Sequence, residues 1–163
     1  MELRRPTIAD KDTILEMLAE FEKAGSAMDG GFISKDMDFE DWILRNQDYE
    51  AGINLPEGFV PSIQYVSFDQ TGRALGFLSL RLRLNDFLLN KGGHIGYSIR
   101  PMECGKGYAK EQLRLGLQEA ASKNITKVLV TCSTDNEASR KTIVACGGVL
   151  EDIREGVERY WIG

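Results

Sequence analysis

Residues 99–110 read IRPMECGKGYAK, and this stretch decides how the rest of the chain is interpreted. A strand-like segment ends at Pro101, a turn bearing Gly105 and Gly107 follows, and a helical apolar pattern begins after Gly107. Glycine lets a backbone approach a ligand closely, and unpaired N–H groups at a helix start attract anions, phosphates above all. The spacing matches neither the dinucleotide fingerprint nor the Walker loop, so a phosphate cradle and a plain structural turn both fit it.

The hydrophobic pattern on either side of this stretch predicts strands that alternate with helices. Before it, we expect strands at Glu2–Arg5, Ser62–Phe68, Leu78–Leu84 and His94–Arg100, with helices starting near Asp10 and at Asp38. After it, we expect a helix through Ala109–Ala120, a strand at Thr126–Cys132, a helix at Asn136–Cys146 and a hairpin of Val149–Ile153 and Val157–Ile162. This order predicts an α/β fold with a mixed sheet covered on both faces, in which the strands joined through residues 94–132 run parallel.

Composition narrows the class of protein. A chain of 163 residues suits one domain, and its net charge of −5 argues against a general nucleic-acid binder. No stretch of 18 apolar residues and no apolar core of a signal peptide is present, which predicts a soluble, cytoplasmic protein that does not enter a membrane. Three cysteines and one histidine lack metal-site spacing, so no metal site is expected.

The glycine-bearing turn resembles the acetyl-coenzyme A motif of the GNAT N-acetyltransferase superfamily. That motif, Arg/Gln-x-x-Gly-x-Gly/Ala, corresponds here to Cys104-Gly105-Lys106-Gly107-Tyr108-Ala109. Thr131–Ser139 is similar to the later strand–helix junction of the family, and Gly92–Pro101 resembles a bacterial branch of acetyltransferases. The resemblance implies one acetyltransferase-like domain over residues 1–163 with a GNAT-like fold. Such a fold has a central, mostly antiparallel sheet, one splayed parallel strand pair and helices on both faces.

The same resemblance implies an N-acetyltransferase that moves an acetyl group from acetyl-coenzyme A to a primary amine by direct attack. The acceptor is a small molecule or a peptide. The pyrophosphate is expected on backbone N–H groups of Cys104, Gly105, Lys106, Gly107, Tyr108 and Ala109. The pantetheine arm is expected along the backbone of Ser98, Ile99 and Arg100, with Asn136 and Ser139 touching it from the next helix. Lys106, Lys110 and Lys141 are candidates for the 3′-phosphate, or alternatively plain solvated residues.

The chain departs from the family pattern at two positions. Cys104 stands where the motif has Arg or Gln, and Arg100 is a possible replacement for the lost side-chain contact. The Cys104 substitution is either simply tolerated or an oxidation-sensitive brake on coenzyme binding, because a helix start lowers the pKa of a thiol. Ile143 occupies the position of the tyrosine that protonates the departing thiolate in many relatives. The proton must therefore come from another group or from water.

Two side chains on one strand are candidates for proton transfer. His94 and Tyr97 are three residues apart, so they point to opposite faces of the strand, and each can equally be a packed structural residue. A backbone N–H near Ile99 is expected to stabilise the oxyanion, whereas Glu103 lies too close to the phosphates to suit a base. Asp29, Asp36 and Asp38 either attract a cationic amine or are merely solvated.

Two rival functions stay open from the residues. The chain is alternatively a non-catalytic coenzyme A-binding or sensor domain, or a nucleotide-binding protein without a pantetheine groove. The strand at Glu158–Gly163 is expected at a sheet edge, where pairing with a second copy would make a homodimer.

Overall fold

The computed structural model describes all 163 residues. The strands are β1 (Glu2–Arg4), β2 (Ser62–Phe68), β3 (Ala74–Arg81), β4 (Ile95–Ile99), β5 (Val128–Ser133), β6 (Val149–Arg154) and β7 (Val157–Ile162). The helices are α1 (Lys11–Ala24), α2 (Phe39–Ala51), α3 (Tyr108–Ser122) and α4 (Glu137–Ala145). Single helical turns occupy Ile8–Asp10, Leu88–Gly92 and Pro101–Glu103. Each helix is too short or too polar to span a lipid bilayer.

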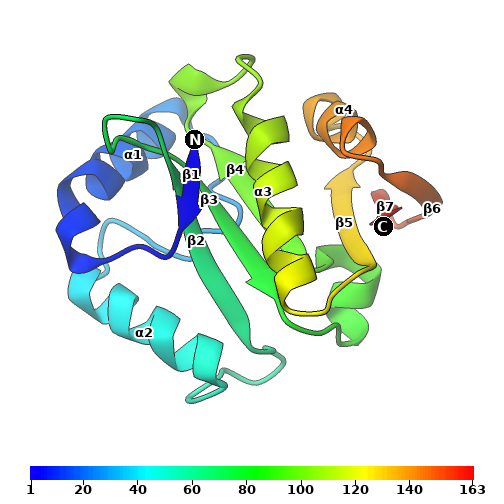
Figure 1. The fold of residues 1–163 in the computed structure, drawn as a ribbon, viewed down its shortest axis with the longest axis horizontal. Coiled ribbons are helices and arrows are strands. Elements are labelled where there is room, and N and C mark those ends of the chain that lie inside the picture. The colour runs from blue at the N-terminus through cyan, green and yellow to red at the C-terminus, as the bar shows by residue number, and fades with distance from the viewer.

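The first sheet has the strand order β1-β2-β3-β4 and is antiparallel throughout. Helices α1 and α2 cover one of its faces and α3 covers the other (Figure 1). The predicted apolar stripe of α1 is buried, and Phe21 from this stripe contacts Phe77 of β3. Asp38 caps α2 as its spacing predicts, because its side chain accepts a hydrogen bond from the Asp41 N–H.

Strand β3 corrects the boundaries expected from the alternating leucines. It spans Ala74–Arg81, so Leu82 and Leu84 lie in the following loop. Because helices cover both faces of the sheet, even the polar Ser79 is buried, and alternation does not mark a solvent face here. The leucine pattern therefore identified a strand but misplaced its ends.

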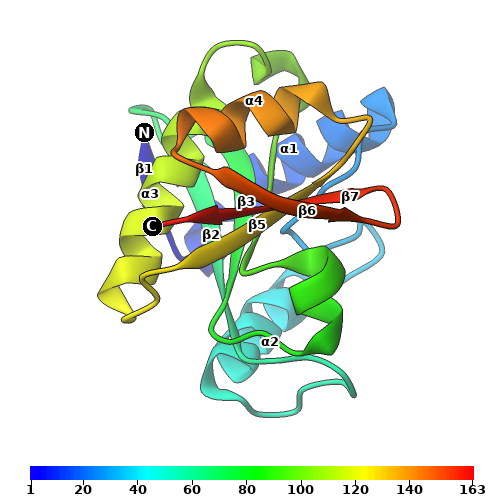
Figure 2. The ribbon, with the colours of Figure 1, turned by 90° about the vertical axis from the view of Figure 1, so that its right-hand side faces the viewer.

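The second sheet has the order β5-β7-β6 and is also fully antiparallel (Figure 2). No parallel ladder joins β4 to β5. The strands touch at His94 and Leu129, where the His94 N–H donates to the Leu129 carbonyl at 2.7 Å and the Leu129 N–H donates to His94 Nδ1 at 2.9 Å. Instead of one mixed sheet there are two antiparallel sheets. β4 and β5 separate beyond this junction, and the expected splayed parallel pairing between them is not shown.

The expected edge strand is also corrected. β7 is the central strand of its sheet, and residues 158–161 have partners on both sides. The free edge belongs to β6, which exposes Val149, Leu150 and Ile153. Sequence proximity to the chain end does not reveal which hairpin strand lies inside. The homodimer stays a prediction, with β6 in place of β7 as the edge available for pairing.

Candidate active site

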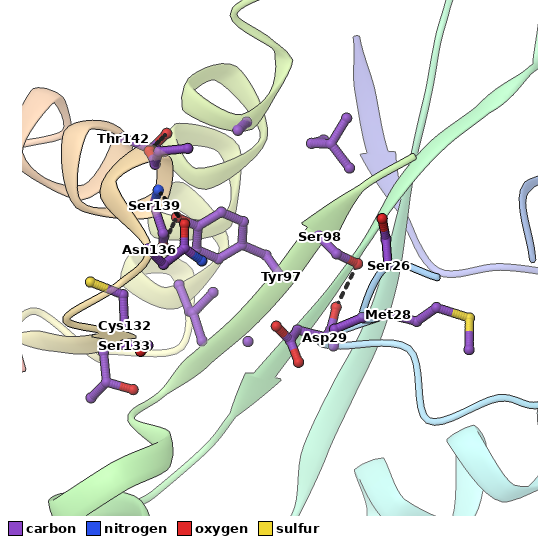
Figure 3. A pocket seen from close by; sticks show the side chains of 18 of the residues that line it. Ser26, Met28, Asp29, Tyr97, Ser98, Cys132, Ser133, Asn136, Ser139 and Thr142 are labelled. Atoms are coloured by element: carbon purple, nitrogen blue, oxygen red, sulfur yellow. Dashed lines mark hydrogen bonds between the residues drawn. The ribbon is translucent and has the colours of Figure 1, made fainter. Parts of the chain in front are cut away.

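A cleft of about 1230 Å³ opens where β4 and β5 separate. Its walls come from the loop of residues 26–33, from β4, from the turn before α3, from β5 and from the start of α4. Figure 3 shows side chains of these elements converging on one space. Ordinary ligand pockets measure roughly 300–1,000 Å³, so this cleft has room for a long ligand and a second small molecule.

The turn before α3 presents free N–H groups to one end of the cleft. Gly105 and Gly107 have φ of +81° and +84°, and a Cβ at either position would meet no atom within 4 Å. Helix α3 has no side-chain cap, and the first of its backbone N–H groups with an acceptor is that of Glu111, which donates to the Gly107 carbonyl. The N–H groups of Tyr108, Ala109 and Lys110 consequently lack protein partners. A bound anion satisfies such groups.

The edge of β4 offers a second row of free backbone groups. The Arg100 N–H donates to the Leu75 carbonyl, and the alternation of an antiparallel ladder then turns Ser98 toward β3 as well. The N–H and C=O groups of Tyr97 and Ile99 face the cleft instead. Of the three residues expected to offer their backbone to the pantetheine arm, Ser98, Ile99 and Arg100, only Ile99 has free backbone groups. Tyr97, which was not expected, also has them. Which residues of β4 have free backbone groups depends on how the strand pairs with β3, and the sequence does not show that pairing.

The Arg100 side chain binds other protein groups and does not replace the missing motif contact. Its side chain is buried, forms ion pairs with Glu16 and Glu20 at 2.9 Å, and donates to the Ala74 carbonyl. Glu20 also accepts the N–H of Met102 at 2.9 Å. Arg100 does not line the cleft and leaves no group free for a phosphate. It anchors the start of the anion-binding turn to α1 instead of replacing the missing motif side chain.

Cys104 does not have the lowered pKa on which the redox hypothesis depended. Its residue lies four positions before α3, and its thiol donates weakly to the carbonyls of Ile99 and Arg100 at 3.7 Å. Burial, followed by the charge of Glu20, raises the pKa of the Cys104 thiol. A thiol with a raised pKa is a poor nucleophile toward oxidants at neutral pH. The structure therefore favours the tolerated substitution.

Tyr97 joins β4 to α4 inside the cleft. Its hydroxyl lies 3.0 Å from Ser139 Oγ, and its ring points toward Asn136 and Ser139 (Figure 3). Burial raises the pKa of Tyr97 to about 12, so its hydroxyl is protonated at neutral pH. Asn136 caps α4 by accepting the Ser139 N–H at 3.1 Å. Ile143, at the position of the family's tyrosine, is fully buried in the core.

His94 lies outside the cleft lining. Its Nδ1 already accepts the Leu129 N–H, so the neutral ring carries its proton on Nε2. Burial, followed by the charge of Arg81, lowers the pKa of His94 below its ordinary value of 6.5. Of the two candidates for proton transfer, only Tyr97 faces the cleft, and His94 instead holds β4 against β5.

This geometry predicts an acid-sensitive β4–β5 junction. Protonation of His94 removes the acceptor of the Leu129 N–H, and the folded pKa lies below the unfolded one. The stabilisation is then complete above about pH 6.5 and is lost as pH falls through the lowered pKa, by at most about 1.4 kcal/mol per pH unit. We expect the unfolding midpoint to fall more steeply between pH 7 and 5 in the wild type than in His94→Asn.

The chain has one histidine, so NMR titration of a single imidazole measures the pKa directly. An imidazole midpoint above 6.5, or parallel pH profiles of the two proteins, contradicts this role of His94.

The lysines expected near the 3′-phosphate and the acidic residues considered for the amine or for a base do not all line the cleft. Lys110 and Lys141 line the cleft, whereas Lys106 does not and pairs with Glu103 at 3.0 Å. Ion pairs with Lys106 and Arg73 lower the pKa of Glu103, which makes it a weak base. Asp29 lines the cleft and has no ion-pair partner in the protein. Asp38 is occupied as a helix cap and Asp36 is exposed outside the cleft.

Free N–H groups at a helix start and a free strand edge open into one cleft, which suits a ligand that carries both phosphates and amides, as coenzyme A does. The chain belongs to the GNAT acetyltransferase family, because the model of the "Acetyltransferase (GNAT) domain" matches residues 1–149. The family transfers an acetyl group from acetyl-coenzyme A to an amine. The predicted family, fold class, coenzyme and N-acetyltransferase activity are thereby confirmed, without the parallel strand pair.

Solved structures share this fold at low sequence identity. A spermidine N-acetyltransferase of Vibrio cholerae is 16% identical with a TM-score of 0.60, covering 99% of this chain and 94% of its own. The yncA structure of Salmonella typhimurium, which contains acetyl-CoA, is 16% identical with a TM-score of 0.64 and coverages of 99% and 92%. A ribosomal-protein-S5-alanine acetyltransferase of Vibrio fischeri is 17% identical with a TM-score of 0.64 and coverages of 98% and 89%. No curated protein sequence matches the chain.

Proposed function

We propose that the cleft binds acetyl-coenzyme A along the free edge of β4 and acetylates a small primary amine that enters beside residues 26–33. The observation that carries this proposal is the meeting of two rows of unpaired N–H groups in one cleft. The phosphates lie on the N–H groups of residues 105–110, with Lys110 and Lys141 nearby. The pantetheine amides pair with Tyr97 and Ile99, as an added strand would.

The chemistry follows from groups around the thioester. The acceptor ammonium first loses one proton to solvent, and the neutral amine attacks the thioester carbon. The C–N bond forms as the carbonyl oxygen gains negative charge, which a free backbone N–H on the cleft edge of β4 stabilises, beyond the pantetheine arm and away from the phosphates. The C–S bond then breaks and its electron pair leaves on sulfur. The second amine proton reaches that sulfur through the Tyr97 hydroxyl, so the products are the acetamide and free coenzyme A.

The positions of Tyr97 and Ser139 help to decide between an enzyme and a non-catalytic coenzyme A-binding or sensor domain. The sensor hypothesis arose because Ile143 replaces the family's acid. A protonated hydroxyl is nonetheless present in the cleft, supplied by β4 instead of α4 and oriented by Ser139. This arrangement supports a catalyst over a binding module.

Thermal unfolding with acetyl-coenzyme A, with ATP as the control, tests the proposal. At a ligand concentration near a hundred dissociation constants, stabilisation is about 2.7 kcal/mol, which raises the midpoint by about 5–10 °C at this chain length. We expect that shift with acetyl-coenzyme A and none with ATP. Release of free thiol in the presence of an amine then tests turnover. A shift without thiol release for any amine would favour the sensor, and equal shifts would favour a nucleotide-binding protein.

A further inference from the structure

Arg81 is a cation in the cleft without a counter-ion. It is the last residue of β3, partly buried, and it lines the same cleft as β4 and the loop of residues 26–33. Its Nη1 donates to the carbonyls of Gly92 and Gly93 at 3.0 and 3.4 Å. Nε and Nη2 donate to no protein atom, and no carboxylate lies within ion-pair distance. Two parallel donors of the guanidinium are therefore free.

The guanidinium lies on the face of β4 that is covered by the loop of residues 26–33, where the amine is proposed to enter. It packs against Gly96, where an added Cβ would lie 3.1 Å from Nη2 and 3.2 Å from Nη1. Gly96 and Ser98 share this face by alternation, and the Ser98 hydroxyl donates to the Asp29 carbonyl at 2.8 Å. Tyr97 points to the opposite face. Arg81 thus sits with the loop of residues 26–33 and not with the groups that face α4.

That loop can press against β4 because of a glycine. Gly30 has a φ of +82°, and a Cβ there would lie 2.3 Å from the Gly96 carbonyl oxygen. This contact brings Asp29 to the rim of the cleft, with its carboxylate toward the open space (Figure 3). The cleft therefore holds a free carboxylate and a free guanidinium on one face, separated by more than an ion-pair distance.

The separation matters because the two groups do not neutralise each other. Desolvation lowers the pKa of Arg81, which the charge of Asp29 only partly opposes. A guanidinium nevertheless stays charged in proteins, so its partial burial without a partner is unfavourable in the free enzyme. A planar anion with two oxygens relieves that cost, since carboxylates bind guanidinium through two parallel hydrogen bonds.

We propose that the acceptor is an amino acid or a similar small zwitterion, whose carboxylate binds Arg81 and whose ammonium group approaches Asp29 before it loses its proton. This inference rests on the proposed acetyl transfer and specifies its substrate class. Arg81 lies beside Gly96, three residues along β4 from the Ile99 end that faces the phosphate site. The carboxylate is held there away from the coenzyme phosphates, which would repel it.

Paired acceptors that differ only in the carboxylate test the proposal. Thiol release from acetyl-coenzyme A is measured with L-leucine and isopentylamine, and with similar pairs across side-chain types. We expect kcat/KM to be about 10- to 100-fold higher for the amino acid of the preferred pair, the range of a hydrogen-bonded charge pair. In Arg81→Gln that ratio falls to near one. Arg83→Gln is the matched control, because Arg83 is exposed and does not line the cleft.

Binding of the product separates this inference from the proposed function. Calorimetry measures N-acetyl-L-amino acids, each as free acid and as amide, on the enzyme saturated with coenzyme A. Tighter binding of the free acid in wild type and Arg83→Gln, lost in Arg81→Gln, supports the inference even if no amine is turned over. Equal binding of acid and amide, or acid binding that survives in Arg81→Gln, overturns it. Preferential acetylation of peptide N-termini over free amino acids also overturns it.

Discussion

Gly107→Ala is expected to weaken acetyl-coenzyme A binding by about 10- to 100-fold while leaving the protein folded. The methyl group projects into open space at the start of α3, where a bound phosphate would otherwise contact the backbone. Overpacking of this kind costs about 1–3 kcal/mol, which sets the expected range. Calorimetric titration with acetyl-coenzyme A measures the dissociation constant.

Backbone strain has to be separated from that steric effect. An alanine at a φ of +84° is strained whatever its surroundings. Gly72 is the matched control, because its φ of +87° is similar, a Cβ there also meets no atom within 4 Å, and it lies in the β2–β3 turn outside the cleft. We expect Gly72→Ala to lose similar stability but to bind the coenzyme normally. Equal dissociation constants in both variants and the wild type would rule out the anion-binding role of this turn.

Tyr97→Phe is expected to lower kcat by about 10²- to 10⁴-fold, the usual contribution of a positioned proton donor. The ring is kept, so the main loss is the hydroxyl that meets Ser139. KM for the coenzyme should change little, because the backbone of Tyr97 is unaltered. Steady-state thiol release at saturating acetyl-coenzyme A, with the best acceptor found, measures kcat.

Two further variants test whether the loss of kcat comes from the Tyr97 hydroxyl and from its contact with Ser139. Tyr65→Phe removes another buried hydroxyl, one that donates to Glu119 at 3.2 Å outside the cleft, and should leave kcat unchanged. Ser139→Ala keeps the Tyr97 hydroxyl but removes its partner. We expect an intermediate loss of kcat from imperfect orientation. Wild-type kcat in Tyr97→Phe would show that water delivers the proton to sulfur.

Local patterns were sufficient for much of the fold and for one part of the site. The apolar periodicity located α1, the Asp38 spacing located the start of α2, and the glycine turn marked the start of α3, whose first N–H groups are free. These features depend on interactions between residues close in sequence. Hydrophobic periodicity, capping and glycine conformation are all written within a few positions, so the sequence alone determined them.

The roles of Arg100, His94 and Arg81 required the tertiary structure. Arg100 lies beside the motif, but its side chain forms ion pairs with the carboxylates of Glu20 and Glu16, which are 80 and 84 positions away along the chain. His94 is paired with Leu129 on another strand, and Arg81 stands out only because no carboxylate reaches it.

The same holds for sheet order. Whether β6 or β7 lies at the edge, and which backbone N–H and C=O groups of β4 face the cleft, depends on the strand chosen as neighbour. Both choices are made by packing between segments distant in sequence. A single chain read in order carries no signal for them, whereas the folded chain settles them through the contacts that bury its core.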